Sequence, residues 1–362
     1  METSVNVPQT WHSYLEIDLQ AFRENVQYLK DVLPEGTRQM AVVKSNAYGH
    51  GAVEICRELE GRVSWLAVAH VYEATELREA GINMPILVFG VPTEQTASLY
   101  HEWDLTAVIS DLNHFNILPE NTEAHLQFDT GMGRLGLRPE QVEDALKEIN
   151  KEKLSVSGVM SHLACADDPE SPKTKQQIDL AKTLFSRFPD EYERHIHNTA
   201  GLLYHFDPAF TIVRHGIGMY GYDPSVNPKH QLQPVLTWKS RVMQAKPVKK
   251  GETISYGAKW QADCDGRLLV VPVGYSDGLP RNMTGKIRFK LNEKEMDVKG
   301  VVTMEYTMLF TDDFGEEGDE VTILGKSDKD VRALSDATET ITYELLTRIP
   351  AKIPRYYLNH ST

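Results

Sequence analysis

The chain has 362 residues, of which 41% are hydrophobic and 25% are charged, a composition typical of folded globular proteins and not of disordered ones. This length corresponds to two domains of usual size, or to one large domain with an appendage. With 52 acidic and 38 basic residues the net charge is −14, which argues against non-specific binding to nucleic acid or to an anionic membrane surface.

The three cysteines, Cys56, Cys165 and Cys264, are odd in number and widely spaced, which fits neither a disulfide framework nor a cysteine zinc site. The first residues lack the basic and apolar regions of a secretory signal. No apolar run approaches the roughly 20 residues that a membrane span needs. We therefore predict a cytoplasmic protein with reduced thiols.

The first two thirds of the chain alternate short apolar runs with amphipathic segments. The amphipathic segments predict helices over 18–33, 140–149 and 174–188. Strands that alternate with helices form parallel β–α–β units, and eight such strands match a (β/α)8 barrel over residues 1–233. A doubly wound open sheet is the alternative. The predicted strands are 41–44, 64–70, 85–90, 105–110, 124–130, 155–162, 193–198 and 211–218.

After about Gln233 the pattern changes. Short β-rich runs separated by Gly, Asp and Pro predict a smaller, mainly β domain over residues 234–362, with helical periodicity returning near Ser335. The acidic segment 312–320 is typical of a solvent-exposed loop.

In a (β/α)8 barrel, chemistry takes place where the strands end and the following loops begin. The predicted strand ends carry a polar ring with one lysine and two arginines, which indicates an anionic ligand with a phosphate or carboxylate group. The members of this ring are Lys44, His70, Arg134, His162, Asn198 and Arg214.

Lys44 follows three apolar strand residues in the segment AVVKSNAYGHG (41–51). Partial burial of the lysine stem would lower the pKa of the amine, and a neutral amine can form a Schiff base with a carbonyl compound. The alternative is a lysine that merely extends from the strand end into water.

The segment HLQFDTGMGRLGLRPE (125–140) contains a GxGxxG pattern just after a predicted strand. A dinucleotide site also needs an acidic residue about 20 residues later, at the end of the next strand, and that strand ends in Ser161–His162. We interpret the segment as a glycine-rich loop that presents Arg134. The strand alternation turns three polar side chains toward the barrel interior: His125, Gln127 and Asp129.

His195 and His197 lie on one face of a predicted strand. Together with His162, Asp167 and Asp168 they resemble the ligands of a metal-dependent hydrolase. The alternative is a set of structural, hydrogen-bonded histidines. We favour this alternative and predict no metal site, because no further carboxylate closes a strand where a ligand is needed.

Taken together, the segments resemble the alanine racemase family over nearly the whole chain. The family consists of enzymes that depend on pyridoxal 5'-phosphate (PLP) and have a barrel followed by a β-domain. The resemblance implies interconversion of L- and D-alanine by two-base proton transfer at Cα, which supplies D-alanine for peptidoglycan. Its motifs follow in family order: AVVKSNAYGHG, DTGMGRLG, SHLACADD, HNTAG, RHGIGMYG, ISYGAKW, VGYSDGLPR and KIPR.

The resemblance also implies roles for individual residues. Lys44 would bind PLP covalently and act as one base, and Tyr256 of the partner subunit in a head-to-tail homodimer would act as the other. Arg214 would face the pyridine nitrogen, while Arg134 and the Met304 backbone N–H would receive the substrate carboxylate. The remaining implied cofactor contacts are Tyr48, His162, Asn198, Thr199, Gly216 and Ile217.

The chain departs from the family pattern at Gln127, where many members have a carbamylated lysine, and at Ala351, where a tyrosine often lines the site entrance. These departures leave the substrate range open, with serine as a second candidate substrate. Two other functions remain as alternatives. A PLP carrier would lack the β-domain, and a related decarboxylase would use a β-domain cysteine, for which Cys264 is poorly placed in the polar turn QADCDG.

Overall fold

The computed structural model describes residues 12–325 and 327–360 and divides into two compact units. The barrel unit comprises Arg23–Ala47 and Ala52–Leu232. The β unit comprises the chain up to Phe22, Tyr48–Gly51 and the chain from Gln233 onward. The prediction about a secretory signal falls largely on residues 1–11, which lie outside the described part.

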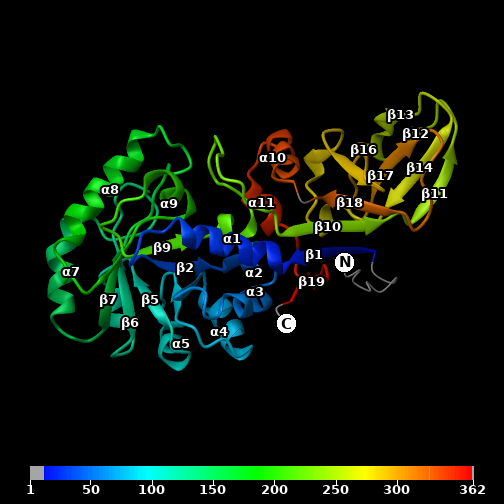
Figure 1. Cartoon of the computed structure of the whole chain (residues 1–362). Coiled ribbons are helices and arrows are strands. Elements are labelled where there is room, and N and C mark those ends of the chain that lie inside the picture. Colours follow the sequence, from blue (N-terminus) through cyan, green and yellow to red (C-terminus); the bar gives the residue numbers. More distant parts are fainter. Residues whose placement is uncertain (1–11, 326, 361–362) are drawn as a thin grey trace. The chain divides into compact units, whose positions relative to one another are not determined.

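Eight parallel strands form the centre of the barrel unit, in the order β8-β7-β6-β5-β4-β3-β2-β9 (Figure 1). The two end strands are joined by backbone hydrogen bonds from Thr211 N–H to Arg194 O (2.8 Å) and from Arg214 N–H to His197 O (2.9 Å). The predicted barrel is therefore confirmed and the open sheet is excluded. The strands are β2 (Arg38–Val42), β3 (Trp65–Val68), β4 (Ile86–Val88), β5 (Thr106–Ile109), β6 (Glu123–Gln127), β7 (Ser155–Met160), β8 (Glu193–His195) and β9 (Ile212–His215).

Helices follow the strands, and Figure 1 shows α7 and α8 on the outside of β6 and β7. The three predicted helices are present as α1, α7 and α8, each within a few residues of its expected bounds. Helix α8 begins with Pro172, and proline is favoured at this position because the N–H groups of the first helical turn have no partner within the helix. The helical elements up to residue 220 are α1 (Leu19–Asp31), α2 (Lys44–Tyr48), α3 (Ala52–Leu59), α4 (Val71–Glu79), α5 (Ala97–Glu102), α6 (His114–Ile117), η1 (Pro139–Gln141), α7 (Val142–Ile149), α8 (Pro172–Phe185), α9 (Thr199–His205) and η2 (Ile217–Tyr220).

Several barrel strands are apolar on both faces, as expected where helices cover a parallel sheet, whereas β6 also buries His125 and Gln127. Met40, Ala41 and Val42 on β2 are all buried. The first predicted strand is misplaced, because β2 starts at Arg38 and ends at Val42, two residues before Lys44. Lys44 therefore lies at the start of the turn that follows the strand.

The β unit contains a nine-stranded sheet in the order β11-β14-β17-β16-β15-β18-β10-β1-β19 and the two-stranded ribbon β12-β13. Strand β1, which was not among the predicted strands, runs antiparallel to β10 and parallel to β19. Val248, Ile254 and Leu268 belong to a core within this unit. The strands are β1 (Ser13–Asp18), β10 (Leu236–Arg241), β11 (Gln244–Val248), β12 (Thr253–Ile254), β13 (Trp260–Gln261), β14 (Gly266–Val271), β15 (Arg288–Leu291), β16 (Lys294–Lys299), β17 (Thr307–Thr311), β18 (Glu320–Leu324) and β19 (Arg355–Leu358).

Short helical elements complete the β unit. Helix α10 (Asp328–Ala337) begins before Ser335, where helical periodicity was expected to return, and α11 (Thr342–Thr347) follows it. The segment 312–319 connects β17 to β18 as the predicted loop, and Glu320 already belongs to β18. The three short 3₁₀ turns are η3 (Tyr256–Ala258), η4 (Tyr275–Asp277) and η5 (Arg281–Met283).

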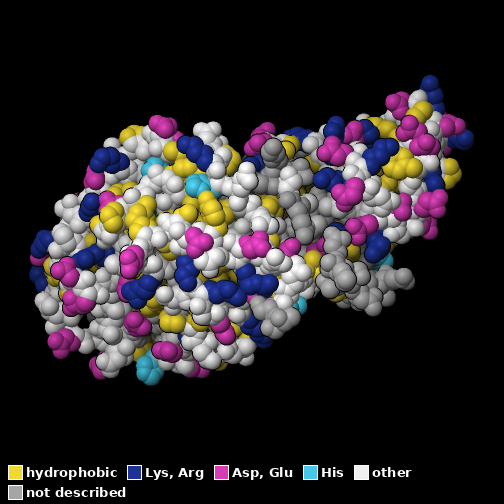
Figure 2. Space-filling model, viewed as in Figure 1, with side chains coloured by type: hydrophobic (Ala, Val, Ile, Leu, Met, Phe, Trp, Pro, Cys, Tyr) yellow, Lys and Arg dark blue, Asp and Glu magenta, His cyan; other side chains and the backbone are white. Residues whose placement is uncertain are grey.

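Acidic and basic side chains are interspersed over the face of the molecule shown in Figure 2. This mixed surface fits the moderate excess of acidic residues in the sequence. In the described part of the chain, no helix combines the length and the apolar character needed to cross a membrane.

Candidate active site

Lys44 opens a turn with an unusual backbone. The short element α2 has a helical pattern of backbone hydrogen bonds, but Ser45, Asn46, Ala47 and Tyr48 have φ values of 51 to 54°, in the left-handed region. This conformation costs a non-glycine residue roughly 1–2 kcal/mol. Such strain persists only where surrounding contacts hold it, and it is concentrated at functional sites.

Glu73 on α4 makes some of the contacts that stabilise this strained turn. Its Oε1 accepts a hydrogen bond from the Ser45 N–H at 2.6 Å. Its Oε2 accepts from the N–H groups of Ala69 (2.8 Å) and His70 (3.1 Å), directly after β3. One carboxylate therefore ties the turn after β2 to the loop after β3. Sequence reasoning missed Glu73, although its position three residues after His70 is that of a capping-box acid.

The Lys44 amine is half-buried, and burial lowers its pKa below the ordinary lysine value. The nearby positive charges of Arg134 and Arg214 lower the pKa further, while the negative charge of Glu73 opposes them. The neutral amine, which is the nucleophilic form, is thereby favoured.

Arg214 on β9 is buried with a relative exposure of 2%. Its Nη2 donates to the carbonyls of Ser161 (2.8 Å) and Ile196 (3.2 Å) and to His162 Nδ1 (3.0 Å), and its Nη1 donates to His195 Nδ1 (3.0 Å). Burial, followed by repulsion from Arg134, lowers the pKa of Arg214 to about 9, so the guanidinium remains charged at neutral pH.

The histidines around Arg214 are neutral. A guanidinium can only donate, so His162 and His195 accept at Nδ1 and carry their protons on Nε2. His195 Nε2 then donates to His125 Nδ1 at 2.8 Å. Burial, and next the charge of Arg214, lowers the pKa of His125 and of His162 to about 3 each, and that of His195 well below its ordinary value. These contacts thus place a positive charge among uncharged partners.

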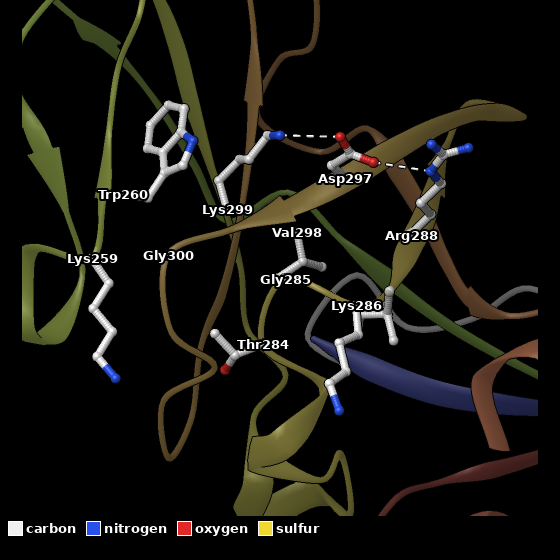
Figure 3. A pocket seen from close by; sticks show the side chains of 11 residues that line it. Lys259, Trp260, Thr284, Gly285, Lys286, Arg288, Asp297, Val298, Lys299 and Gly300 are labelled. Atoms are coloured by element: carbon white, nitrogen blue, oxygen red, sulfur yellow. Dashed lines mark hydrogen bonds and ion pairs between the residues drawn. The ribbon is translucent and has the colours of Figure 1, made fainter. Parts of the chain in front are cut away.

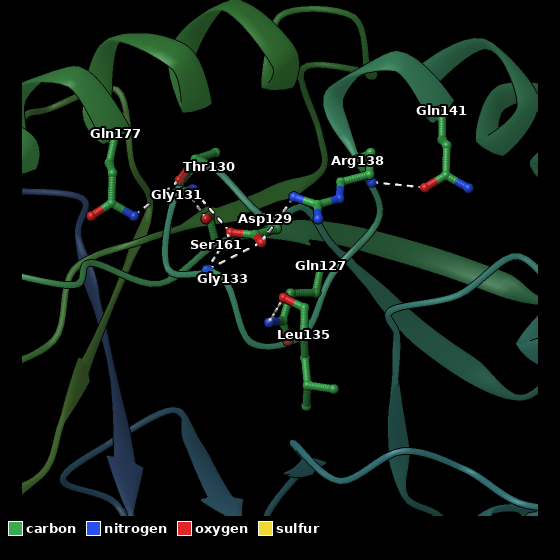
Figure 4. Close-up of polar contacts among 10 residues, drawn as sticks. All are labelled: Gln127, Asp129, Thr130, Gly131, Gly133, Leu135, Arg138, Gln141, Ser161 and Gln177. Atoms are coloured by element: carbon green, nitrogen blue, oxygen red, sulfur yellow. Dashed lines mark hydrogen bonds and ion pairs between the residues drawn. The ribbon is translucent and has the colours of Figure 1, made fainter.

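Arg134 is exposed and lies on the loop between β6 and η1. Figure 4 shows its neighbours Gly133 and Leu135 on this loop. The carboxylate of Asp129 accepts hydrogen bonds from the N–H groups of Gly131 (2.9 Å) and Gly133 (3.0 Å), which folds the loop back on its own start. All three glycines of the GxGxxG pattern have positive φ, including Gly136 at +131°. The structure supports the loop interpretation, since the glycines form a tight turn and the helical segment of η1 and α7 begins only at Pro139, after the last of them.

Gln127 at the end of β6 is buried, and its Nε2 donates to the backbone carbonyl of Leu135 at 2.8 Å (Figure 4). The side-chain amide nitrogen of Gln127 thus contacts the backbone of the loop that carries Arg134.

Four further predicted residues lie after β8 and β9. The Asn198 side chain accepts from Gly201 N–H at 2.8 Å and caps α9. The Thr199 hydroxyl accepts from Gly216 N–H at 3.1 Å, which joins the starts of α9 and of η2, the latter beginning at Ile217. A Cβ at Gly218 would lie 2.5 Å from the Thr199 methyl group, so this glycine permits the close approach.

The remaining predicted residues belong to the β unit. Tyr48 is buried, and burial raises the pKa of its hydroxyl. Tyr256 and Met304 are strongly exposed, at 72% and 53%. Ala351 is exposed as well. The other predicted site residues lie in the barrel unit: Lys44, Arg134, His162, Asn198, Thr199, Arg214, Gly216 and Ile217.

The metal hypothesis finds no support in the contacts of these histidines. His195 is committed to His125 and Arg214, and His197 Nε2 accepts from the Asp207 N–H at 3.1 Å. Within residues 12–325 and 327–360, no group of three or more His, Cys, Asp or Glu side chains is placed to hold a metal ion.

Comparison with known proteins gives consistent matches over nearly the whole chain. The model of the alanine racemase N-terminal domain matches residues 17–224, and that of the C-terminal domain matches residues 235–357. An alanine racemase of Streptococcus pneumoniae (strain 70585) is 34% identical over 355 residues, which cover 94% of this chain and 96% of that protein.

Solved structures of racemases have the same fold as this chain. An alanine racemase of Clostridium difficile has a TM-score of 0.92 at 29% identity, covering 96% of each chain. An alanine racemase of E. faecalis has a TM-score of 0.91 at 32% identity, covering 97% of this chain and 99% of that one. A histidine racemase of Leuconostoc mesenteroides has a TM-score of 0.87 at 27% identity, covering 98% of this chain and all of that one.

The barrel with its lysine-bearing turn, together with these matches, defines an amino-acid racemase, an isomerase that interconverts enantiomers. The chain belongs to the alanine racemase family.

Proposed function

We propose that this enzyme interconverts L- and D-alanine with PLP bound to Lys44, and that it supplies D-alanine for peptidoglycan. The observation that carries the proposal is the position of Lys44. It lies on a strained turn at the barrel mouth, and burial and two arginines lower the pKa of its amine. The family match extends over both parts of the chain and supports the same activity.

The barrel residues fit PLP. Arg214 is a buried cation with five N–H donors, and its hydrogen bonds to described residues use Nη2 and one N–H of Nη1. Nε–H and the second N–H of Nη1 are therefore left for an acceptor such as a ring nitrogen. Lys44 offers a nucleophilic amine for the aldehyde group. The Thr199 hydroxyl and the Ile217 N–H are the donors offered to a phosphate. The Gly216 N–H donates to the Thr199 hydroxyl at 3.1 Å, so it would exchange that bond to reach the phosphate.

When bound, PLP supplies an electron-withdrawing ring that makes the Cα proton of an attached amino acid acidic. In this proposal the protein residues move that proton. Lys44 acts on one face of Cα and Tyr256 of the partner subunit acts on the other, because inversion needs removal from one face and delivery to the opposite face. The Arg214 guanidinium stays protonated at neutral pH, so in this proposal it donates a hydrogen bond to the ring nitrogen without transferring its proton. His162 positions Arg214 through the bond between Nη2 and Nδ1.

The substrate carboxylate binds to Arg134 and to the Met304 backbone N–H of the partner subunit, and Tyr48 and Asn198 complete the cofactor contacts. The active unit in this proposal is a cytoplasmic, head-to-tail homodimer in which the part after Gln233 supplies Tyr256. The wide exposure of Tyr256 and Met304 in the single chain supports this, since both side chains are left for a partner to cover.

The substrate range is the open part of the proposal. Gln127 and Ala351 replace residues that resemblance associates with the site and its entrance, and we propose serine as a second substrate. The structural similarity to a histidine racemase shows that this fold is also used for a larger amino acid.

A chiral assay of the PLP-loaded protein against a panel of L-amino acids tests this proposal. We expect racemisation of alanine first and of serine more slowly. Borohydride treatment should attach the cofactor to one peptide, the one containing Lys44. Release of carbon dioxide from ornithine, lysine or diaminopimelate would favour the decarboxylase, and the absence of any turnover would favour the PLP carrier.

A further inference from the structure

A cavity of about 460 Å³ lies in the β unit, within the volume range of small-molecule sites (Figure 3). Its walls come from the segment just after Tyr256, from the segment between η5 and β15, and from the end of β16. Four cations and one carboxylate line it: Lys259, Lys286, Arg288, Lys299 and Asp297.

Two of the four cations are already neutralised. Asp297 accepts from Arg288 Nε at 2.9 Å and from Lys299 Nζ at 3.0 Å, and Glu295 accepts from Arg288 Nη1 at 3.0 Å. Within the described residues, neither Lys259 nor Lys286 has an ion-pair partner. The cavity therefore holds a surplus of two positive charges.

The two lysines frame one part of the wall. Figure 3 shows their side chains extending in the same direction on either side of Thr284. Trp260 forms an adjoining wall and is braced from behind by Phe310, with ring centroids 5.0 Å apart. A fixed wall with two flexible ammonium groups is suited to a compact ligand with several negative charges, since lysine recognises phosphate and carboxylate groups as a point charge.

The cavity wall is also tied to the segment that carries Tyr256. Gly300 has φ +71°, and a Cβ there would lie 2.8 Å from the Cβ of Ser255. The Ser255 hydroxyl donates to the Val301 carbonyl at 2.9 Å, and the Val302 N–H donates to the Thr284 hydroxyl at 3.1 Å. Movement of this wall is thereby transmitted to the residue directly before Tyr256.

We propose that this cavity binds a small polyanion, a phosphorylated or polycarboxylate metabolite with at least two negative charges, between Lys259 and Lys286. Occupancy shifts the backbone at Ser255 and so adjusts Tyr256. The effect on activity rests on the proposed role of Tyr256, whereas binding itself does not.

The test is calorimetric titration of the PLP-loaded enzyme at low ionic strength with pyrophosphate and, separately, with citrate. Using the holoenzyme keeps the proposed cofactor-phosphate site filled. The variant Lys259→Gln/Lys286→Gln is compared with Lys246→Gln/Lys250→Gln, which removes the same charge from exposed positions of the β unit outside the cavity. We expect saturable binding of at least one anion, weakened about tenfold or more in the cavity variant and less than twofold in the control. Preference between the two anions identifies the ligand class.

Racemisation of alanine is then measured with the bound anion at saturation. We expect kcat to change in the wild type and in the control variant, and the response to disappear in the cavity variant. Equal weakening of binding in both variants, or no saturable binding, would overturn the proposal. Dissociation of the dimer by the anion in sedimentation would also overturn it, since the lysines would then pair with carboxylates of a second copy. Binding by a protein that racemises no amino acid would leave the cavity assignment standing and reject the proposed function.

Discussion

Opposing charges act on the Lys44 amine. Arg134 and Arg214 lower its pKa and Glu73 raises it, on top of the larger effect of burial. Removing a positive neighbour relieves repulsion of the ammonium form and so raises the pKa. Removing the negative neighbour takes away an attraction and so lowers it.

Two variants should therefore shift Lys44 in opposite directions. With Arg134→Gln, covalent capture of PLP by the apoprotein should need a higher pH than in the wild type. With Glu73→Gln it should proceed at a lower pH. The measurement is the pH midpoint of the capture rate, followed by absorbance. Shifts in the same direction for both variants would show that loop disorder, and not charge, controls the amine.

Gln127 holds the loop of Arg134 through its backbone bond to Leu135. Replacement by Met keeps the length but removes the donor, which should raise KM for alanine about two- to tenfold while kcat changes little. A larger effect on kcat than on KM would mean that Gln127 acts on the reacting groups.

The same residue predicts independence from carbon dioxide. Glutamine cannot be carbamylated, so activity in degassed buffer should match activity after addition of bicarbonate. A clear rise with bicarbonate would mean that a lysine elsewhere is being carbamylated and that Gln127 does not occupy the position that the resemblance gives it.

Among the elements, the glycine loop of residues 129–138 offers a matched pair of tests. Gly133→Ala places a Cβ in open space at φ +71°, so only the left-handed backbone is penalised, by about 1–2 kcal/mol. Gly136→Ala would put a Cβ 2.6 Å from the Asp129 nitrogen, which adds roughly 1–3 kcal/mol of overpacking.

We expect Gly136→Ala to raise KM for alanine more than Gly133→Ala does, with borohydride labelling of Lys44 intact in both. The measurements are steady-state kinetics and urea unfolding of the two variants. Equal behaviour of the pair would show that the loop is not held by its contact with Asp129.

The apolar runs predicted barrel strands such as β3 (WLAV) and β4 (ILV), because strands that are buried on both faces consist mainly of apolar residues. Strand β8 (Glu193–His195) carries no such run. Other elements gave no such signal. The left-handed turn after Lys44 consists of ordinary residues whose conformation is imposed by tertiary contacts such as the one from Glu73. Strand β1 pairs with β10 and β19, which are far away in sequence, and no local pattern predicts that pairing.

The candidate site also has a part that the sequence predicts and a part that depends on tertiary contacts. Lys44, Arg134 and Arg214 stand at strand ends or in distinctive motifs, so their types and positions could be identified from the sequence. The tautomers of His162 and His195 follow from hydrogen bonds to Arg214 that only the folded chain creates. The direction of the Gln127 bond depends likewise on where the loop backbone runs.

At the scale of the whole molecule, each active site in the proposed dimer consists of residues from both subunits. Lys44→Ala and Tyr256→Phe should each be inactive alone. After mixing and subunit exchange, half of the dimers should be mixed and each should have one complete site, so activity should recover to about a quarter of the wild-type value. No recovery despite exchange shown by mass spectrometry would place both bases in one chain.

The two-base assignment of Lys44 and Tyr256 is tested most directly by hydrogen exchange at Cα of alanine in D₂O. The PLP-loaded wild type should exchange and racemise both enantiomers. Tyr256→Phe should still exchange the Cα proton of one enantiomer, through Lys44, but should neither invert it nor exchange the other. Proton NMR combined with chiral chromatography reads both quantities at once. Exchange of both enantiomers with inversion at the wild-type rate in Tyr256→Phe would contradict the assignment, because Lys44 alone would then serve both faces.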